Sequence, residues 1–267
     1  MNLPLKNQVI LITGGGGFLA AHFARAIVAA GGVPVLADLD RAAAQRNAVA
    51  AGEAADPIGL DITDEAACRA AVSDLLARHG RLDALVNNAA IDPKFELADS
   101  GAPTAAFEEY PLEHWKRSLD VNLTGAFLIT RAVAQHFRNT QRGLVVNIAS
   151  MYGLVGPDQR LYSPDETLPP PRYKPVDYTV TKAGLHGLTR YLATYWAGTG
   201  LRANTLTFGG VRRGHDEGFL GRYAKRSPLG RMADPVEVEQ PLVFLLSDGA
   251  SYMNGANLVV DGGWTAW

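Results

Sequence analysis

The sequence is poor in cysteine and has no long apolar segment. Its 267 residues include one cysteine, Cys68, which excludes an internal disulfide and leaves no cluster of thiolates for a metal ion. The six histidines are scattered, and none stands at ligand spacing from another histidine or from the cysteine. No stretch approaches the roughly 18 apolar residues of a membrane-spanning helix. We therefore predict no disulfide framework, no metal site and no membrane span.

An excess of charge of either sign is also missing. The chain has 25 basic and 27 acidic residues, a net charge of −2, which gives no general attraction to nucleic acid or to a membrane surface. The first residues lack the basic region, apolar core and cleavage site of a signal peptide, so a cytoplasmic protein is expected. We find no internal repeat and no linker, and the length suits one α/β domain over residues 1–267.

Glycine is abundant near the N-terminus. Four consecutive glycines at 14–17 separate an apolar, β-branched run at 8–13 from residues that recur at helical spacing, beginning with Leu19 and Phe23. Strand, glycine turn and helix in this order are typical of a phosphate site. Glycine lets the backbone approach the ligand, and the helix N-terminus offers free N–H groups. A flexible tight turn is the alternative, and we favour phosphate binding.

The next apolar run, at 33–37, ends at an acidic residue. Asp38 follows the first glycine by about two dozen residues, where a carboxylate can accept hydrogen bonds from both ribose hydroxyls of NAD. The same carboxylate would repel the 2′-phosphate of NADP. Asp38 could instead cap the following helix, but Asp40 can serve as that cap. We therefore predict NAD as the cofactor, with Arg41 as the one nearby residue that could weaken this preference.

Two further apolar runs end in short polar motifs. The motifs are Asp61-Ile62 and Asn87-Asn88-Ala89. Asparagine side chains can hold a turn and cross-link strands, so the second motif could be purely structural.

A long helix predicted over 112–137 contains Asn122 and a glycine, which are locally unfavourable in a helix interior. These residues indicate a kink or a functional position. The strand predicted at 143–149 ends at Ser150. Ligands of open parallel sheets bind at the carboxyl ends of the strands, so Ser150 would face the cofactor cleft. Taken alone, Ser150 could equally be a turn serine.

Tyr178 and Lys182 have the spacing Tyr-x-x-x-Lys at the start of a predicted helix. Residues four apart share one helix face, so a phenol would lie beside an ammonium group. A free tyrosine titrates near ~10, and a neighbouring cation favours the phenolate and lowers that pKa. Such a tyrosine can exchange a proton with an alcohol or a ketone. The pattern alone is weak, because it is common on surface helices.

Two segments near these residues could cover a ligand. The insertion 153–176 separates Ser150 from Tyr178 by 28 positions and is rich in proline and aromatic residues. The lid 211–227 is basic. Its cations are Arg212, Arg213, Arg222, Lys225 and Arg226. Arginine suits bidentate contact with phosphate, so the lid favours an anionic substrate, with solvated charges or subunit contacts as the alternative.

Assembled in order, these residues resemble the short-chain dehydrogenase/reductase family over essentially the whole chain. The resemblance implies a doubly wound, seven-stranded parallel sheet of the Rossmann type with helices on both faces. The matching positions are Thr13-Gly14 with the glycine loop, Asp38, Asp61-Ile62, Asn87-Asn88-Ala89, Asn122, Ser150, Tyr178, Lys182 and Val260-Asp261-Gly262-Gly263.

The resemblance also implies residue roles. Tyr178 looks like the catalytic acid/base, and Lys182 resembles the residue that lowers its pKa and holds the nicotinamide ribose. Ser150 looks like the donor that orients the substrate oxygen, and Asn122 like the residue that positions a relay water near the lysine. The predicted cofactor-binding residues are Gly14, Gly17, Phe18, Leu19, Asp38, Asp61, Ile62, Asn88, Ala89, Lys182, Gly209 and Val211.

The chain departs from the family pattern in three places. Phe18 and Ala20 occupy two glycine positions, which makes the loop look like that of sugar-nucleotide epimerases. Phe208 stands where the family usually has proline. The insertion roughly doubles the usual Ser-to-Tyr separation. Together with the ending at 261–267, the insertion resembles members associated with bacterial surface-sugar synthesis.

The expected function is an NAD-dependent oxidoreductase that interconverts a secondary alcohol and a ketone, on a sugar, sugar phosphate or nucleotide sugar. The alternatives are an epimerase or dehydratase that keeps its NAD bound, and a dinucleotide sensor without chemistry. The expected partner is a small-molecule substrate, with no nucleic acid and no membrane. Apolar residues on more than one face of the helix after Tyr178 predict a homodimer or homotetramer.

Overall fold

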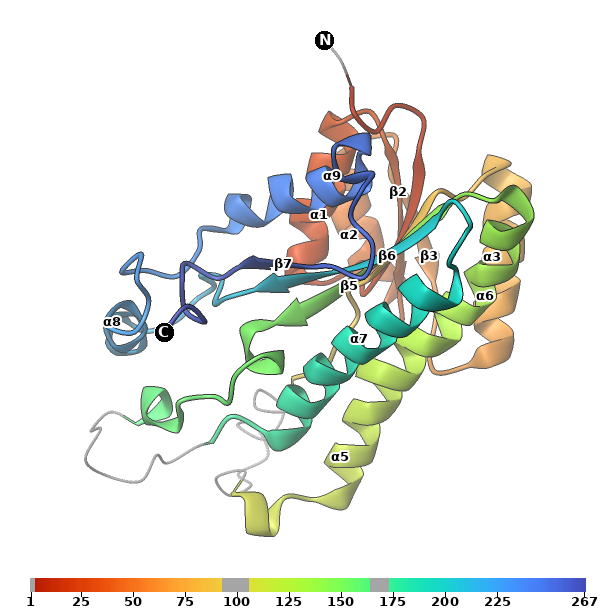
Figure 1. Ribbon diagram of the computed structural model, residues 1–267. Coiled ribbons are helices and arrows are strands. Elements are labelled where there is room, and N and C mark those ends of the chain that lie inside the picture. Colours follow the sequence, from red (N-terminus) through yellow and green to blue (C-terminus); the bar gives the residue numbers. More distant parts are fainter. Residues whose placement is uncertain (1–2, 93–105, 164–172) are drawn as a thin grey trace.

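The computed structural model describes residues 3–92, 106–163 and 173–267, and its centre is a seven-stranded sheet (Figure 1). Every pair of neighbouring strands is parallel, in the order β3-β2-β1-β4-β5-β6-β7, which confirms the predicted fold class. The winding reverses between β1 and β4, the place where such sheets bind ligands. The strands are β1 (Val9–Thr13), β2 (Val33–Asp38), β3 (Asp56–Gly59), β4 (Ala84–Asn87), β5 (Gly143–Ser150), β6 (Leu201–Phe208) and β7 (Asn257–Val260).

Helices pack on both faces of the sheet. Residues of α1, α2 and α9 share one core cluster, and residues of α3, α6 and α7 share another on the opposite face. Within the described ranges, no helix combines the length and the apolar character that crossing a membrane requires. The helices are α1 (Phe18–Ala29), α2 (Arg41–Ala51), α3 (Glu65–His79), α5 (Leu112–Leu119), α6 (Ala126–Thr140), α7 (Val176–Tyr195), α8 (Glu217–Ala224) and α9 (Glu239–Leu246), with short 3-10 turns at η1 (Phe107–Glu109), η3 (Met151–Gly153), η4 (Gln159–Tyr162), η5 (Pro235–Val238) and η6 (Asp248–Ala250).

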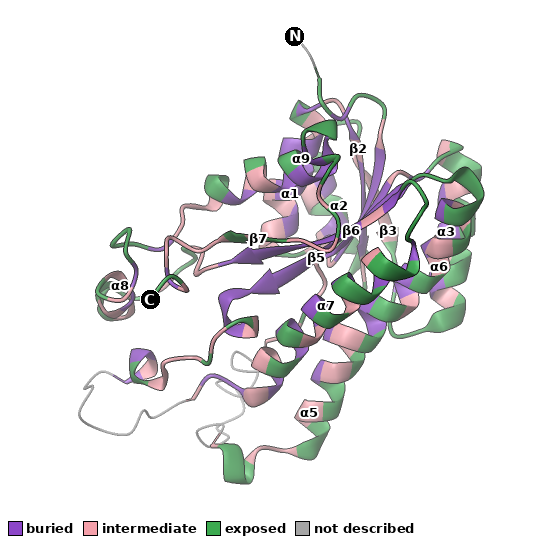
Figure 2. Cartoon of the chain, in the orientation of Figure 1, coloured by how far each residue is buried: buried purple, intermediate pink, exposed green. Residues whose placement is uncertain are grey.

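Strand β1 shows why its sequence is continuously apolar. Ile10 and Ile12 belong to the core cluster with α1, whereas Val9 and Leu11 belong to the cluster with α3 and α6. Side chains alternate between the two faces of a strand, and helices cover both faces here, so every position of β1 is buried. Figure 2 shows the same burial along β5.

The helix predicted over 112–137 is interrupted. A π-helical segment, η2 (Asp120–Gly125), separates α5 from α6 and contains Asn122. A side chain at Gly125 would collide with Ile62, because its Cβ would lie 2.7 Å from the Ile62 side chain. The expected irregularity is therefore present, and it brings the helix close to the loop after β3.

A third apolar cluster lies beyond the carboxyl ends of the strands. It combines Met151 and Tyr152 of η3 with Tyr223 of α8 and Trp264 near the C-terminus. The rings of Tyr223 and Trp264 stack with centroids 4.6 Å apart, and Figure 1 shows the C-terminus beside α8. The cluster joins described parts of the insertion and the lid to the end of the chain. Residues 164–172 of the predicted insertion lie outside the described residues.

A chain of buried hydrogen bonds runs through the centre of the molecule. Asn87 donates from Nδ2 to Thr130 Oγ1 at 3.0 Å and to Asn147 Oδ1 at 2.8 Å. Asn147 in turn donates to Thr189 Oγ1 at 2.8 Å, and the hydroxyls of Thr189 and Thr205 lie 2.7 Å apart. The chain cross-links α6, β4, β5, α7 and β6. Asn87 therefore has a structural role, because its side chain cross-links a neighbouring strand and a helix.

Replacing Asn147 by alanine should destabilise the fold by about 2–4 kcal/mol, because Asn87 and Thr189 each lose a buried partner. Chemical denaturation measures the free energy of unfolding. Asn139→Ala is the matched control: Asn139 is exposed on α6 and accepts from Gln135, so its loss should change stability by no more than about 0.5 kcal/mol. Equal stability of the two variants would contradict the structural role of the chain.

Candidate active site

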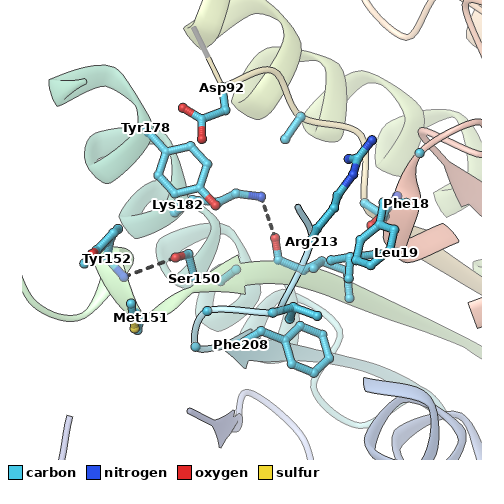
Figure 3. A pocket seen from close by; sticks show the side chains of 18 of the residues that line it. Phe18, Leu19, Asp92, Ser150, Met151, Tyr152, Tyr178, Lys182, Phe208 and Arg213 are labelled. Carbon is cyan, nitrogen blue, oxygen red and sulfur yellow. Dashed lines mark hydrogen bonds between the residues drawn. The ribbon is translucent and has the colours of Figure 1, made fainter. Parts of the chain in front are cut away.

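A cavity of about 450 Å³ opens at the carboxyl ends of β1, β4, β5 and β6. Figure 3 shows side chains converging on it from the glycine loop, from α7 and from the loop after β6. Most of the predicted site residues line this one cavity. They are Gly14, Gly17, Phe18, Leu19, Asp38, Asn88, Ala89, Ser150, Tyr178, Lys182, Gly209 and Val211.

The glycine loop forms one end of the cavity. Gly14 has φ +64°, and a Cβ there would lie 2.7 Å from Ala89 Cα, so only glycine fits. Asn88 fixes the turn by donating from Nδ2 to the carbonyls of Thr13 and Gly14. Helix α1 starts after Gly17 without a side-chain cap and without an acidic residue in its first turn. Its first N–H groups can therefore bind the diphosphate of a dinucleotide.

Asp38 ends β2 at the rim of the cavity. Its Oδ2 accepts from Gly16 N at 2.9 Å, and its Oδ1 accepts from Asp40 N at 2.9 Å. Asp40 caps α2 by accepting from Ala42 N and Ala43 N, as the sequence predicts. The Asp38 carboxylate is thus held in place while its remaining lone pairs stay available for a ribose. Together with the glycine loop, it makes the site a good fit for a nicotinamide dinucleotide.

Asp61 and Ile62 lie outside the first cavity. They line a neighbouring cavity of about 700 Å³ that shares Gly14, Asp38 and Ala89 with it. A dinucleotide with its diphosphate at Gly14 and a ribose at Asp38 would extend in this direction. The placement agrees with a role of Asp61 and Ile62 on the adenosine side, which stays a prediction.

The two phenylalanine departures have different surroundings. The Phe18 ring lines the cavity and carries the guanidinium of Arg213 above it, 5.0 Å from the ring centre. Phe208 also lines the cavity, but it is buried at the end of β6 and stacks on Phe23 of α1 with centroids 6.2 Å apart. Phe208 therefore packs the sheet against α1, whereas Phe18 places a cation from the lid next to the glycine loop.

Ser150, Tyr178 and Lys182 form the opposite end of the cavity. Ser150 is the last residue of β5, and its Oγ accepts from Tyr152 N at 3.3 Å. Tyr178 is in the first turn of α7, and Lys182 is one turn later. Helix α7 lies close to η3, since a Cβ at Gly153 would be 2.7 Å from the Lys182 backbone. Close packing thus brings the end of β5 and the start of α7 together across the insertion.

The predicted lowering of the Tyr178 pKa is wrong for this structure. Burial raises the pKa of the phenol well above its usual range, the Asp92 carboxylate adds to the rise, and the hydrogen bond with Ser150 opposes it. The Lys182 ammonium lies 5.8 Å from the ring centre and donates to Ile148 O at 2.9 Å. Burial lowers the pKa of Lys182 itself to about 8.

Asn122 links the chain after β4 to α7. Its Oδ1 accepts from Ile91 N at 2.8 Å, and its Nδ2 donates to Ile91 O at 3.0 Å and to Thr181 Oγ1 at 3.2 Å. Asn122 is not among the described residues that line the cavity. Its amide fixes the chain after β4 to α7, next to Lys182. A role in positioning a relay water stays a prediction.

Most of the lid cations bond to the protein itself. Arg212 pairs with Asp234 at 3.0 Å, Arg222 donates to Leu161 O at 2.9 Å, and Arg226 pairs with Asp158 at 2.6 Å. Arg213 lines the cavity, but at the glycine-loop end. The cluster is therefore not arranged as a phosphate site beside Tyr178, and an anionic substrate has no support from Arg212, Arg222 and Arg226.

Sequence reasoning missed an ion pair at the catalytic end. Lys174, just before α7, is buried, forms a salt bridge with Asp92 and holds its ammonium 3.8 Å from the centre of the Tyr178 ring. Tyr152 and Tyr162 also line this end, with their hydroxyls 3.4 Å apart. The sequence carried no signal for the pair, because Asp92 and Lys174 are 82 positions apart.

Comparison with known proteins agrees with this geometry. A family model described as short chain dehydrogenase matches residues 8–163, and one described as Enoyl-(Acyl carrier protein) reductase matches residues 168–265. The 3-alpha-(or 20-beta)-hydroxysteroid dehydrogenase of Mycobacterium tuberculosis is 35% identical over 266 residues, which cover 100% of this chain and 92% of the relative. The D-threitol dehydrogenase of Mycolicibacterium smegmatis is 34% identical, with coverage of 98% and 94%.

Solved structures give the same result. A gluconate 5-dehydrogenase from Burkholderia cenocepacia, in complex with NADP and tartrate, matches with a TM-score of 0.84 and 29% identity. The match covers 100% of this chain and 98% of that protein.

Proposed function

Because the chain belongs to the short-chain dehydrogenase family and is a secondary alcohol/ketone oxidoreductase, we propose that it uses NAD and acts on a small polyhydroxylated alcohol, such as a polyol or a sugar derivative. One observation carries the proposal. Ser150, Tyr178 and Lys182 share a single cavity with the glycine loop and Asp38. A dinucleotide bound at the loop would therefore have its reactive ring near the Tyr178 hydroxyl.

Proton transfer is the chemistry of Tyr178. In ketone reduction the phenol donates its proton to the carbonyl oxygen, and the Ser150 hydroxyl donates a hydrogen bond to the same oxygen. In alcohol oxidation the phenolate takes the hydroxyl proton. The nicotinamide, when bound, supplies or accepts the hydride. Lys182, which lines the cavity, would hold the nicotinamide ribose.

The protonation state of Tyr178 decides whether ketone reduction or alcohol oxidation is favoured at neutral pH. Because its pKa is raised, the phenol is protonated at neutral pH and is ready to act as an acid. Reduction of a ketone is therefore expected to proceed at neutral pH. Oxidation of the alcohol needs the phenolate and should accelerate as the pH rises.

The proposal of a polyhydroxylated substrate rests on the lining of the catalytic end. The hydroxyls of Tyr152 and Tyr162 offer donors and acceptors in a small space. Two relatives are named for threitol and gluconate, both of which carry several hydroxyls. An association with surface-sugar synthesis gains no support from these relatives. The described ends of the insertion and the lid would close over such a substrate.

A substrate screen that follows NADH absorbance tests this proposal. The panel should contain polyols, sugar acids, sugar phosphates and a hydroxysteroid, since one relative is named for a steroid. Polyols or sugar acids should react best. A preference for the steroid would overturn the substrate class, and release of no NADH with any alcohol would favour an epimerase that keeps its cofactor. We propose that the reaction takes place in the cytoplasm.

Tyr178→Phe should abolish turnover while NAD still binds. The variant keeps the ring and removes the titrating oxygen, so the rate should fall by at least the ~10²–10⁴ that general acid–base catalysis contributes. Steady-state kinetics give the rate, and quenching of protein fluorescence by the dinucleotide gives the affinity. Near-normal turnover would show that another group transfers the proton.

NAD should bind more tightly than NADP, by roughly tenfold or more. The fixed Asp38 carboxylate would face the 2′-phosphate, and an uncompensated like-charge contact of about 1.4 kcal/mol gives that factor. Titration with both cofactors measures the ratio, and Asp38→Asn should bring it closer to one. The gluconate 5-dehydrogenase neighbour holds NADP, so the outcome is open to test. Equal or tighter NADP binding would show that a cation such as Arg41 outweighs Asp38.

The protein should be a homodimer or a homotetramer in solution. Leu185, Leu192 and Trp196 of the α7 segment are buried, whereas Tyr191 and Tyr195 stack on each other with exposed fractions of 61% and 55%. Exposed aromatic pairs of this kind are typical of subunit interfaces. Light scattering at micromolar concentration measures the mass. A monomer would refute the expectation, and Tyr191→Lys should shift an oligomer towards smaller species, with exposed Lys6→Glu as a control.

A further inference from the structure

Lys174 is a second lysine beside Tyr178, in addition to Lys182. Its side chain is 4% exposed, and its ammonium lies 3.8 Å from the centre of the Tyr178 ring, closer than the 5.8 Å of Lys182. Lys174 also forms a salt bridge with Asp92, from the segment after β4. Figure 3 shows Asp92 beside the Tyr178 ring. Both charges of the pair therefore act on the phenol at short range.

A clamp fixes the position of Lys174. Gln159 of η4 donates from Nε2 to Lys174 O at 3.3 Å and accepts from Lys174 N at 2.8 Å. These two hydrogen bonds fix the backbone of Lys174, and its ammonium then lies over the Tyr178 ring. A cation above an aromatic face is attracted to the ring, and the attraction grows when the ring gains the negative charge of a phenolate.

We propose that the buried Lys174–Asp92 ion pair, clamped over Tyr178 by Gln159, controls proton transfer at the Tyr178 hydroxyl. Lys174 favours the phenolate and Asp92 favours the phenol, so the pair balances the two forms. Both residues act through Tyr178 and are positioning residues. The inference rests on the proposed function, in which Tyr178 exchanges the proton with the substrate.

Within the described residues, the polar and charged groups near Tyr178 come from several elements. They are Ser150 of β5, Tyr152 of η3, Tyr162 of η4, Asp92, Lys174, and Asp177 and Lys182 of α7. Burial is the largest cause of the raised pKa of Tyr178, and the Asp92 carboxylate is the second largest. The Asp177 carboxylate accepts from Tyr110 and from the Tyr178 backbone. Lys182 is directed to the Ile148 carbonyl. The ion pair therefore supplies one charge of each sign that can be changed by substitution outside α7.

A purely structural latch is the alternative. The salt bridge joins the segment after β4 to the chain entering α7, and a buried ion pair that loses one partner destabilises a protein strongly. A latch would affect folding, KM and stability. If the pair were only a latch, the pKa of Tyr178 would stay the same whether one of the two charges or both were removed.

Direct titration of Tyr178 distinguishes the two roles. Tyrosine labelled with ¹³C at Cζ reports ionisation by NMR, and the Tyr178 signal is identified by its loss in Tyr178→Phe. Asp92→Asn should lower the Tyr178 pKa by roughly one unit, and Lys174→Met should raise it by a similar amount. The double variant removes both charges and should titrate close to the wild type, which guards against a fold defect caused by one unpaired charge. Exposed Lys6→Met is the matched control for the loss of a lysine.

The pH dependence of kcat/KM for alcohol oxidation should follow the same order. The part of the profile that rises with pH should move to lower pH in Asp92→Asn and to higher pH in Lys174→Met. At a fixed pH on this part of the profile, kcat/KM should change at least threefold in each variant. An unchanged Tyr178 titration in both single variants would overturn the proposal. The NMR result does not depend on turnover, so failure of the proposed function, seen as an active Tyr178→Phe, is recognised separately.

Discussion

The hydrogen bonds of Asn147 are the constraint on which the position of the active site depends. Asn147 binds Asn87 in the neighbouring strand and Thr189 in α7, and all three side chains are buried. Apolar packing alone allows a helix to slide over a sheet with little change in buried area, but a directional bond inside a low-dielectric core does not. Since Thr189 is on α7, the bond fixes how far α7 extends beyond β5. Tyr178 consequently reaches Ser150 at the end of that strand.

Local signals predicted the fold and the cofactor half of the site. The continuous burial of β1, the glycine loop before α1 and the acidic end of β2 are each decided by a few adjacent residues, so they are readable in sequence. The partners of the lid arginines were not predictable. Asp158 and Asp234 reach Arg226 and Arg212 only through the folded path of the chain. The contact of Lys174 with Asp92 has the same origin.

The pKa of Tyr178 could not be predicted from the spacing of Tyr178 and Lys182 alone. Helical periodicity correctly placed Lys182 one turn after Tyr178, but it could not give the direction in which the ammonium points. Lys182 donates to the Ile148 carbonyl, and desolvation of the phenol then outweighs the distant cation. The sign of the pKa shift was therefore decided by burial and by Asp92, neither of which the motif contains.

The Gln159–Lys174 clamp has an evolutionary consequence. Its two residues are 15 positions apart in sequence, and their paired hydrogen bonds close the intervening segment at its base. The entropy of closing a loop grows only with the logarithm of its length, so doubling the segment would cost about 0.6 kcal/mol. Insertions and deletions between these anchors would therefore leave Lys174 and Tyr178 in place. The chain between these two anchors can therefore change in length while Lys174 and Tyr178 keep their relative positions.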